Sequence, residues 1–205
     1  MIAYLIGSIP TSVWIGKAFY HIDIREMGSG NAGATNTIRL LGWKAGIPVL
    51  LIDVFKGWIA VYLSRYLLPP DLTEMARVNY QIIVALAAVL GHVFPLYAGF
   101  RGGKGIATLL GVGIALYPQA ILVVLAIFMA VLIVTGFVSL SSIIASVCFP
   151  FIVVFFSDQD HLFLNLLAVF VAVFVPLTHR KNIKRLLQRK EPKFTLRKKK
   201  PTGSA

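Results

Sequence analysis

The chain has 205 residues, of which 58% are hydrophobic and 14% are charged, and its mean hydropathy is +0.81. Soluble domains are nearer ~45–50% apolar and ~25% charged, so this composition excludes an ordinary soluble fold, a disordered chain and a disulfide scaffold. Residues 106–157 form a run of 52 residues without Lys, Arg, Asp or Glu. A membrane-spanning helix needs about 20 apolar residues, so this run predicts at least two spans. Its continuity argues against an outer-membrane barrel, whose strands alternate.

Basic residues outnumber acidic ones by 20 to 8, which gives a formal net charge of +12. Eleven of the basic residues lie between Arg180 and Lys200, where Glu191 is the single acid. In a membrane protein such a segment indicates the cytoplasmic side and contact with anionic headgroups. Phe194 is the one aromatic residue among these basic residues, so we expect no nucleic-acid partner. Cys148 is the single cysteine, which excludes a disulfide within the chain.

The apolar segments predict seven transmembrane helices in one polytopic domain, residues 1–192. A basic tail follows at 193–205, and its last five residues resemble a cloning remnant. The first apolar run lacks a small-residue cleavage pattern, so we interpret it as a span and not as a signal peptide. Tyr117-Pro118 separates the fourth span from the fifth, because the residue before a proline disfavours helix. The predicted spans are about 2–20, 45–66, 79–98, 106–117, 118–135, 137–156 and 162–178.

The charges also predict the orientation. Seven spans with the N-terminus outside place the loops at 21–44 and 99–105 and the basic tail in the cytoplasm, as the positive-inside rule requires. Merging 106–135 into one span would put the first two basic loops opposite the tail. The fold class is therefore an all-α integral membrane protein with short loops and a cytoplasmic C-terminus. The acidic loop residues then face outward: Asp71, Glu74, Asp158 and Asp160.

The first cytoplasmic loop is rich in glycine and in short hydrogen-bonding side chains. Glycine permits positive φ and close approach to a ligand, and amides at a glycine turn or helix N-terminus form an anion site. Thr35 or Asn36 is expected to cap a short helix over residues 38–43. A flexible polar connector is the alternative interpretation. The candidate binding residues are Gly28, Ser29, Gly30, Asn31, Thr35, Asn36 and Arg39.

The second loop contains the turn Gly102-Gly103-Lys104-Gly105 just before a predicted helix. Glycine amides, the Lys104 charge and the positive end of the helix together predict a phosphate cradle. The turn is not a Walker A loop, because Ala98 and Gly105 stand where that motif needs Gly and Ser or Thr. A positive-inside turn with no ligand is the alternative.

Three further groups of polar residues lie at or inside the predicted spans. His179 and Asn182 are i, i+3 neighbours on a predicted helix and Arg185 continues the row, which suggests either a binding face or a polybasic lipid anchor. Asp53 and Lys56 have the same spacing inside the second span, where charges are costly, so they form an ion pair or serve a function. The remaining residues have either a structural or a ligand-binding role: His92, Ser139, Ser141 and Ser142.

These blocks resemble the bacterial PlsY family of acyl-phosphate-dependent glycerol-3-phosphate acyltransferases. The resemblance covers nearly the whole chain and rests on residues 28–36 with Arg39, 53–57, 91–105 and 179–183. It implies a multi-pass protein of the bacterial inner membrane whose active site faces the cytoplasm. It also implies the first step of phospholipid synthesis. An acyl group passes from acyl phosphate to the 1-hydroxyl of glycerol 3-phosphate, giving lysophosphatidic acid and phosphate.

By motif position, the resemblance implies catalytic roles for Ser29, Arg39, His179 and Asn182. It assigns the phosphate loop to Gly102, Gly103, Lys104 and Gly105. Further substrate contacts are expected from Gly28, Gly30, Asn31, Thr35, Asn36, Ser142 and Arg185. Supporting roles are expected for Asp53, Lys56, His92 and Glu191.

No cofactor or metal is expected, and the expected partners are the two substrates and membrane lipid, with a monomer favoured. Acyl phosphate is an activated donor and the loops offer no obvious strong base. The proton of the attacking hydroxyl is therefore expected to pass to the leaving phosphate, with His179 orienting a substrate or sharing the proton. The alternative function is a transporter or binding protein for a phosphorylated anionic solute, although transporters usually bind near the midplane between internal repeats.

Overall fold

The structure is a computed structural model that describes residues 1–156 and 161–194. Within these ranges the chain forms α-helices and short 3-10 turns and no β-strand, which confirms the all-helical prediction. The 3-10 turns are η1 (Ile24–Glu26), η2 (Arg65–Leu67) and η3 (Leu96–Ala98). The α-helices are α1 (Ile2–Gly7), α2 (Thr11–Tyr20), α3 (Ala34–Leu41), α4 (Trp43–Ser64), α5 (Glu74–Val93), α6 (Ile106–Leu116), α7 (Pro118–Thr135), α8 (Val138–Phe156), α9 (Leu162–Thr178) and α10 (Arg180–Leu187).

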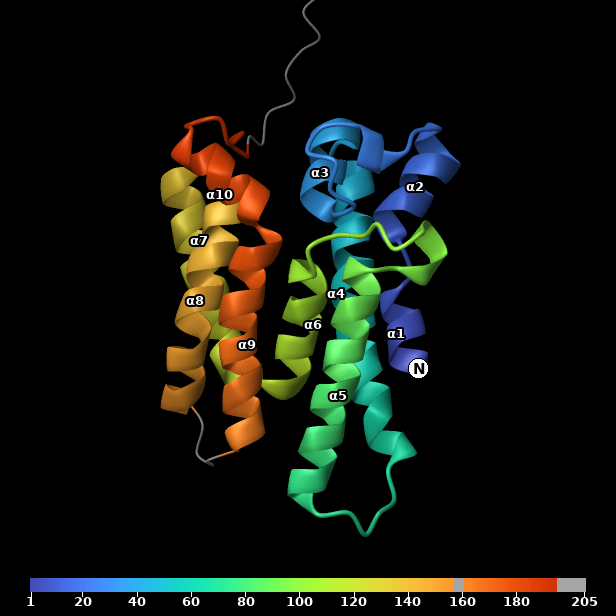
Figure 1. Ribbon diagram of the computed structural model, residues 1–205, viewed down its shortest axis with the longest axis vertical. Coiled ribbons are helices and arrows are strands. Elements are labelled where there is room, and N and C mark those ends of the chain that lie inside the picture. Colours follow the sequence, from blue (N-terminus) through green and yellow to red (C-terminus); the bar gives the residue numbers. More distant parts are fainter. Residues whose placement is uncertain (157–160, 195–205) are drawn as a thin grey trace, which may run out of the picture.

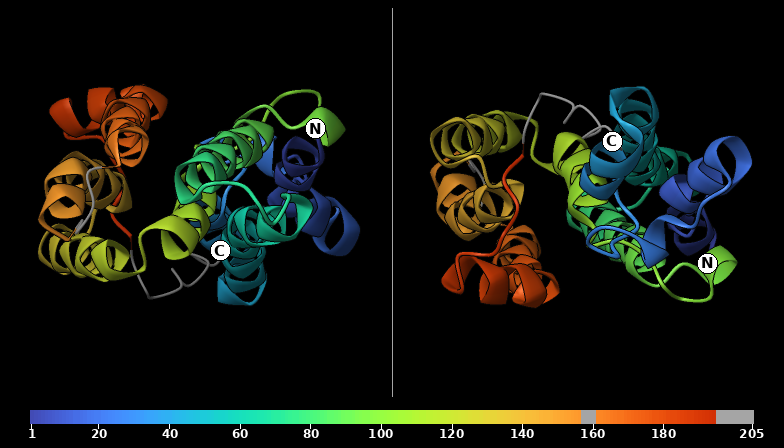
Figure 2. Two further views of the ribbon diagram at one scale, coloured as in Figure 1. Left: turned by 90° about the horizontal axis from the view of Figure 1, so that it is seen from below. Right: turned by 90° about the horizontal axis from the view of Figure 1, so that it is seen from above.

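The helices form two groups that stand side by side (Figures 1 and 2). In the first group α4 packs against α3, α5 and α6, and α1 packs against α5; in the second, α8 packs against α7 and α9. The helix α6 leads from the first group to the second (Figure 1). The groups also meet where Phe174 of α9 packs on a core that includes Val61, Ala85 and Val112.

Glycines allow the helices of the first group to pack closely. A Cβ atom on Gly91 of α5 would collide with the carbonyl oxygen of Tyr4 in α1. A Cβ atom on Gly57 of α4 would likewise meet the Thr108 carbonyl of α6, and one on Gly111 of α6 would meet that of Val54. Small residues at such crossings let helix backbones approach in a membrane, where van der Waals packing replaces the hydrophobic effect.

Five segments in the described ranges are long and apolar enough to cross a membrane, and the pair α9 and α10, bent by 60°, makes a sixth. The helix α6 has 11 residues, or roughly 16 Å, about half of a hydrocarbon layer of about 30 Å. The structure therefore confirms a multi-pass membrane protein but supports five or six spans by length and not seven. The predicted break at Tyr117-Pro118 is present, because α6 ends at Leu116 and α7 begins at Pro118.

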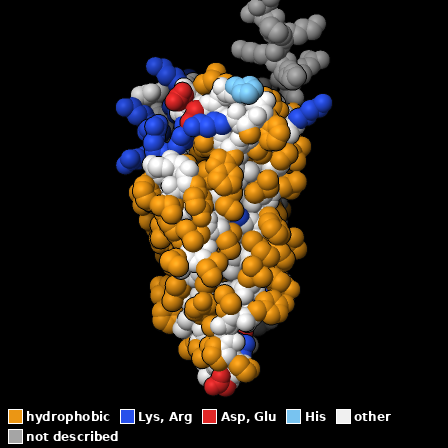
Figure 3. Space-filling model, turned by 90° about the vertical axis from the view of Figure 1, so that its right-hand side faces the viewer, with side chains coloured by type: hydrophobic (Ala, Val, Ile, Leu, Met, Phe, Trp, Pro, Cys, Tyr) orange, Lys and Arg blue, Asp and Glu red, His pale blue; other side chains and the backbone are white. Residues whose placement is uncertain are grey.

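The surface agrees with a membrane location. Hydrophobic side chains cover the flank of the molecule, whereas Lys and Arg gather toward one end (Figure 3). Val134 and Phe155, for example, are each 83% exposed. An apolar surface this extensive is foreign to a soluble monomer and matches contact with lipid.

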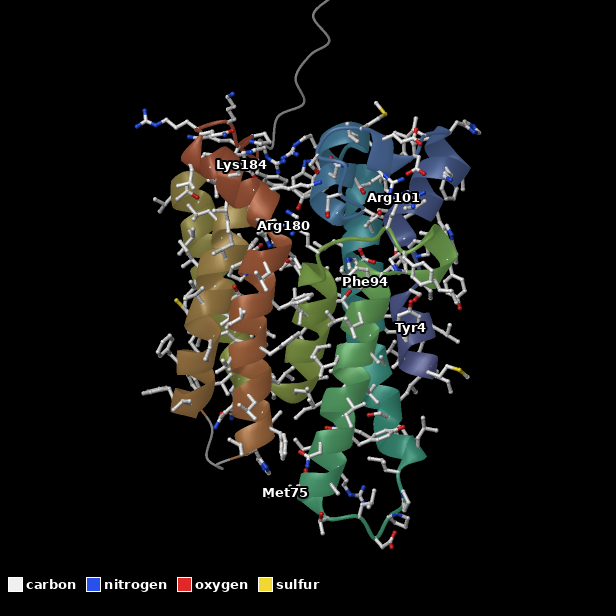
Figure 4. All side chains as sticks on the ribbon, viewed as in Figure 1. Tyr4, Met75, Phe94, Arg101, Arg180 and Lys184 are labelled. Carbon is white, nitrogen blue, oxygen red and sulfur yellow. The ribbon has the colours of Figure 1, made fainter. Side chains whose placement is uncertain are left out.

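The loops that were predicted to share one side lie at the same end of the molecule. Arg101, Arg180 and Lys184 lie in the part of the molecule nearer that end, and Met75 lies at the other end (Figure 4). The first loop and α3 are at the end where α10 lies (Figure 1). Of the four acidic residues predicted to face outward, Asp158 and Asp160 lie outside the described residues.

Candidate active site

A cavity of ≈ 810 Å³ is lined by residues of both helix groups. One end is polar and cationic, and the rest is apolar. The polar lining comes from the two loops, α3 and the α9–α10 bend: Ser29, Asn31, Thr35, Arg39, Lys104, His179, Asn182 and Glu191. The apolar lining comes mainly from α6 to α9 and includes Tyr117, Ile121, Leu125, Phe128, Met129, Phe149, Leu167 and Val171. Such a cavity suits an amphipathic ligand with an anionic head.

Asn36 organises the first loop from within. It is 1% exposed; its Oδ1 accepts a hydrogen bond from the Ser29 backbone at 3.0 Å, and its Nδ2 donates to the Ile24 and Met27 carbonyls at 3.0 and 3.1 Å. Gly28 has a φ of +63°, and a Cβ atom there would collide with Oδ1 of Asn36. The side chain predicted to touch substrate is thus committed to the loop, and it positions Ser29, whose hydroxyl makes no hydrogen bond to the described residues.

The helix that follows the loop differs from the prediction. It runs from Ala34 to Leu41 with Gly33 at its N-cap, so Thr35 and Asn36 lie in its first turn and do not cap it. Sequence reasoning preferred a side-chain cap, but Asn36 has stronger partners in the loop and a glycine fills the cap position. The helix therefore starts about one turn earlier than predicted and ends two residues earlier, which places Arg39 in its last turn, and Arg39 lines the cavity.

Arg25 ties the two loops together, a role that the sequence did not reveal. Its guanidinium binds both carboxylate oxygens of Asp23, at 2.9 and 2.7 Å, and donates to the carbonyl of Ala98 in η3 at 2.7 Å. The hydrogen bonds from Arg25 hold the pKa of the Asp23 carboxyl far below its usual value, although burial opposes them. Bidentate Arg–carboxylate pairs are among the stronger and more directional contacts, so this pair fixes the first loop on the second.

The glycine turn is built differently from a phosphate cradle. The amides of Gly102 and Gly103 donate to the carbonyls of Val93 and His92, each at 3.2 Å. These two amides are therefore occupied by backbone carbonyls in this arrangement, and their binding of phosphate stays a prediction. A Cβ atom on Gly103 would collide with the His92 ring, so the glycines serve close packing. Of the turn's residues, Lys104 alone appears in the cavity lining.

Glu191 is the centre of a polar network behind the cavity mouth. Its Oε1 accepts from Asn182 Nδ2 at 2.6 Å and from Ser139 Oγ at 2.7 Å, and its Oε2 accepts from Arg185 Nε at 2.7 Å. Burial opposes ionisation, but the hydrogen bonds from Arg185, Asn182 and Ser139 prevail and hold the pKa of Glu191 below its usual value. The network explains how the tail segment supports the site.

Lys104 reaches this network from the opposite helix group. Its Nζ donates to Oδ1 of Asn182 at 2.5 Å. Burial lowers the pKa of Lys104 to about 8, and the nearby Arg185 and Arg39 add to the effect while Glu191 opposes it. Three cations thus converge on one carboxylate, and the positive charge left over is what an anionic ligand would neutralise.

His179 lies at the bend between α9 and α10 and is 3% exposed. Its Nδ1 is 2.8 Å from the carbonyl oxygen of Val175. A carbonyl only accepts, so Nδ1 carries a proton and donates, and Nε2 remains the nitrogen that can accept from a ligand. The imidazole is therefore oriented by a backbone carbonyl, a partner that sequence reasoning did not consider.

Asp53 and Lys56 form a buried ion pair, with 2.8 Å between Nζ and Oδ1. Thr11 Oγ1 donates to the same carboxylate at 2.9 Å, and Lys56 Nζ donates to the Ile9 carbonyl at 2.9 Å. His92 Nδ1 is buried without a hydrogen bond in the described residues, 3.8 Å from Asp53. The pair joins α4 to the break between α1 and α2, which favours the structural interpretation.

The serines of α8 are mostly occupied. Ser141 and Ser142 donate to the carbonyls of Phe137 and Val138, each at 2.9 Å, whereas Ser139 binds Glu191. Ser142 still lines the cavity, as do Asp53 and His92. The predicted site residues absent from the lining are Gly28, Gly30, Lys56, Gly102, Gly103, Gly105 and Arg185.

The described residues hold no group of three or more His, Cys, Asp or Glu side chains arranged to bind a metal ion. The polar groups gathered at the mouth are instead amides, cations and a histidine. Apolar exposed helices and a cavity with a cationic head and an apolar tail define an integral membrane protein with a site for an amphipathic anion.

Comparison with known proteins identifies the family. The sequence matches the family described as glycerol-3-phosphate acyltransferase over residues 1–189. A glycerol-3-phosphate acyltransferase of Fusobacterium nucleatum is 46% identical over 195 residues, which cover 95% of each chain. That of Chlorobaculum tepidum is 41% identical over 222 residues, covering 95% of this chain and 94% of the relative.

Solved structures agree. The crystal structure of PlsY (YgiH), an integral membrane glycerol 3-phosphate acyltransferase, in its glycerol 3-phosphate form superposes with a TM-score of 0.83 at 34% identity. Its lysophosphatidic acid form gives 0.80 at 33%, and each match covers 95% of this chain and 92% of the other. The chain belongs to the glycerol-3-phosphate acyltransferase family, as the resemblance implied.

Proposed function

We propose that this protein transfers an acyl group from acyl phosphate to the 1-hydroxyl of glycerol 3-phosphate, giving lysophosphatidic acid and phosphate. The observation that carries the proposal is the cavity of ≈ 810 Å³, with Lys104, Arg39 and His179 at one end and apolar side chains at the other. Both substrates carry phosphate, which suits the cations, and the donor carries an acyl chain, which suits the apolar part.

The chemistry needs orientation more than a strong base. The glycerol oxygen forms a bond to the acyl carbon, the bond from that carbon to the phosphate oxygen breaks, and the hydroxyl proton passes to the departing phosphate. Lys104 and Arg39 would hold phosphate groups and stabilise developing charge. The Ser29 hydroxyl would donate a hydrogen bond to a substrate. His179 would accept from the glycerol hydroxyl at Nε2 and so hold it near the acyl carbon.

The direct test is an assay of the purified protein with radiolabelled glycerol 3-phosphate. Hexadecanoyl phosphate, hexadecanoyl-CoA and hexadecanoyl acyl carrier protein would be compared as donors. We expect radiolabelled lysophosphatidic acid with acyl phosphate alone. Product from the thioesters at a similar rate would contradict the donor assignment.

A transporter or binding protein for a phosphorylated solute is the alternative, and the buried Asp53–Lys56 pair is the feature that favours it. Against it, the cavity's polar residues crowd one end of the molecule. Uptake of glycerol 3-phosphate into proteoliposomes without product formation would support the transporter.

Two variants of His179 test the path of the proton, because each one retains a polar group near only one of the two ring nitrogens. His179→Asn keeps a donor for the Val175 carbonyl but loses the ε position, whereas His179→Gln keeps a polar group near that position. If His179 only orients the hydroxyl, the Gln variant retains most activity. The Asn variant then loses one hydrogen bond, about 0.5–1.5 kcal/mol or roughly 2–13-fold. Single-turnover rates at saturating glycerol 3-phosphate measure the effect.

A general base would give a different result. Losing it costs typically ~10²–10⁴-fold in rate, and neither amide can replace it. Both variants slowed more than a hundredfold, while still folded and binding glycerol 3-phosphate normally, would assign the proton to His179.

The pKa of Lys104 predicts that the KM for glycerol 3-phosphate depends on pH. Its pKa is about 8, so it is charged below that pH and loses its charge as the pH rises through it. The second ionisation of a phosphate monoester has a pKa of about 6, so it is nearly complete by about pH 7. We therefore expect the KM for glycerol 3-phosphate to rise on the order of tenfold from about pH 7 to about pH 9. Lys104→Arg stays charged throughout and should flatten the profile; an unchanged slope in this variant would refute the assignment.

We also propose that the chain crosses the bacterial inner membrane seven times as a monomer, with the cavity mouth facing the cytoplasm and in contact with anionic lipid. The basic loops and α10 lie together at the mouth, which fits the positive-inside rule. The short helix α6 would be one of the seven passes.

Cysteine labelling tests this orientation. In a Cys148→Ala background, Arg25→Cys and Lys184→Cys should react with a membrane-impermeant maleimide in inverted vesicles, and Asp71→Cys in intact spheroplasts. Reaction of positions 25 and 184 from opposite sides would reject the topology.

A further inference from the structure

The cavity has a defined floor. Along α9 its lining runs from His179 to Leu167 and along α7 from Ile133 to Ile121. Each interval is twelve residues, or roughly 18 Å at ~1.5 Å per residue. One leaflet of hydrocarbon is about 15 Å deep, half of about 30 Å. The cavity is therefore about as deep as one acyl chain of ordinary membrane length.

The floor is rigid because packing and a hydrogen bond fix it. Tyr117 meets Phe149 edge to face, with 5.0 Å between ring centroids and 79° between planes. The Tyr117 hydroxyl donates to the Leu164 carbonyl at 2.8 Å, which attaches the α6–α7 turn to α9. Both rings are buried. Behind them lies packed core that is absent from the cavity lining: Ile82, Ala120, Val153 and Ala168.

From this geometry we propose that Tyr117 and Phe149 set the maximum length of the acyl chain that the enzyme uses. The inference rests on the proposed function, since it assigns the apolar part of the cavity to the acyl chain of the donor. A chain that reaches the rings fills the cavity. For each further methylene the chain must displace packed side chains or bend, so the favourable free energy of burying that methylene is lost.

Two variants should move the floor in opposite directions. Ala145 lines the cavity one helical turn from Phe149 on the side of the mouth. Ala145→Leu should therefore shorten the cavity, and Phe149→Ala should deepen it. Val153→Ala is the matched control, because Val153 lies one turn beyond Phe149 in the same core but does not line the cavity.

The experiment measures kcat/KM for dodecanoyl, hexadecanoyl, octadecanoyl and eicosanoyl phosphate in each variant. Burial of one methylene changes affinity about fourfold, so two methylenes change preference on the order of tenfold. Phe149→Ala should raise the octadecanoyl-to-hexadecanoyl ratio by that factor, and Ala145→Leu should lower the hexadecanoyl-to-dodecanoyl ratio. Val153→Ala should leave both within about twofold, and the KM for glycerol 3-phosphate should stay constant throughout.

The outcomes separate the two proposals. A wild-type protein without product from any acyl phosphate would refute the proposed function. If the wild-type protein is active but Ala145→Leu and Phe149→Ala leave the chain-length ratios unchanged, the proposed limit at Tyr117 and Phe149 would be overturned and the proposed function would stand. The acyl chain would then leave the cavity sideways. If Phe149→Ala does not fold, Ala145→Leu still decides.

Discussion

Replacing Asp53 by Asn is expected to destabilise the protein by about 3–5 kcal/mol, because it leaves the Lys56 ammonium buried without a counter-ion. The two side chains are 2% and 3% exposed, and Nζ lies 2.8 Å from the carboxylate. Asn is nearly isosteric with Asp and can still accept from Thr11, so the change removes mainly the charge. Unfolding in detergent, followed by helical circular dichroism, measures the loss of stability.

The double variant Asp53→Leu with Lys56→Met is the control. Replacing both members of a buried ion pair with apolar side chains is far less costly than replacing one. It should therefore be more stable than Asp53→Leu or Lys56→Met alone, although the Ile9 carbonyl loses its donor. A double variant as unstable as the sum of the single ones would show that the pair has no coupling energy.

The activity of the double variant gives a separate measurement. Asp53 lines the cavity whereas Lys56 does not. A folded double variant with normal turnover would confirm a purely structural pair. A folded but inactive one would assign Asp53 a part in the reaction.

The sequence predicted the residues that converge on the cavity mouth better than the contacts they make. Runs of apolar residues and the charge pattern predicted seven spans, of which five or six in the described residues are long enough to cross a membrane, and Pro118 identified the break between α6 and α7. Lys104 lies far along the chain from His179 and Asn182, and the family resemblance brought the three residues into one site. The structure confirms that they meet: Lys104 binds Asn182, and all three line the cavity.

What sequence reasoning missed depends on partners outside the same turn or loop. Nothing near Gly102 or Gly103 shows that their amides bond to carbonyls at the end of α5. The Arg25 contact to Ala98 spans 73 residues and the Ser139 contact to Glu191 spans 52. The segment at 106–117 was predicted as one of the seven spans because hydropathy measures how apolar a segment is, whereas the 11 residues of α6 are too few to cross the hydrocarbon layer.

Lys104→Ala is expected to raise the KM for glycerol 3-phosphate by roughly 12–160-fold, which corresponds to the loss of about 1.5–3 kcal/mol from a charge-assisted hydrogen bond. Lys104 is the turn's one side chain that lines the cavity, and burial strengthens its field. The substitution also removes the donor from Asn182 Oδ1. Steady-state kinetics with hexadecanoyl phosphate measure the change.

Arg101→Ala is the matched control, because Arg101 lies in the same loop, carries the same charge and is exposed outside the cavity lining. It should change the KM by less than about twofold, since an exposed charge is screened by solvent and salt. Lys104→Arg separates charge from shape and should recover most of the lost affinity. Equal effects of Arg101→Ala and Lys104→Ala would mean that the loop contributes only its net charge to topology or to general attraction of anions. A large effect confined to position 104 would place a substrate phosphate against this one ammonium group, between Asn182 and Arg39.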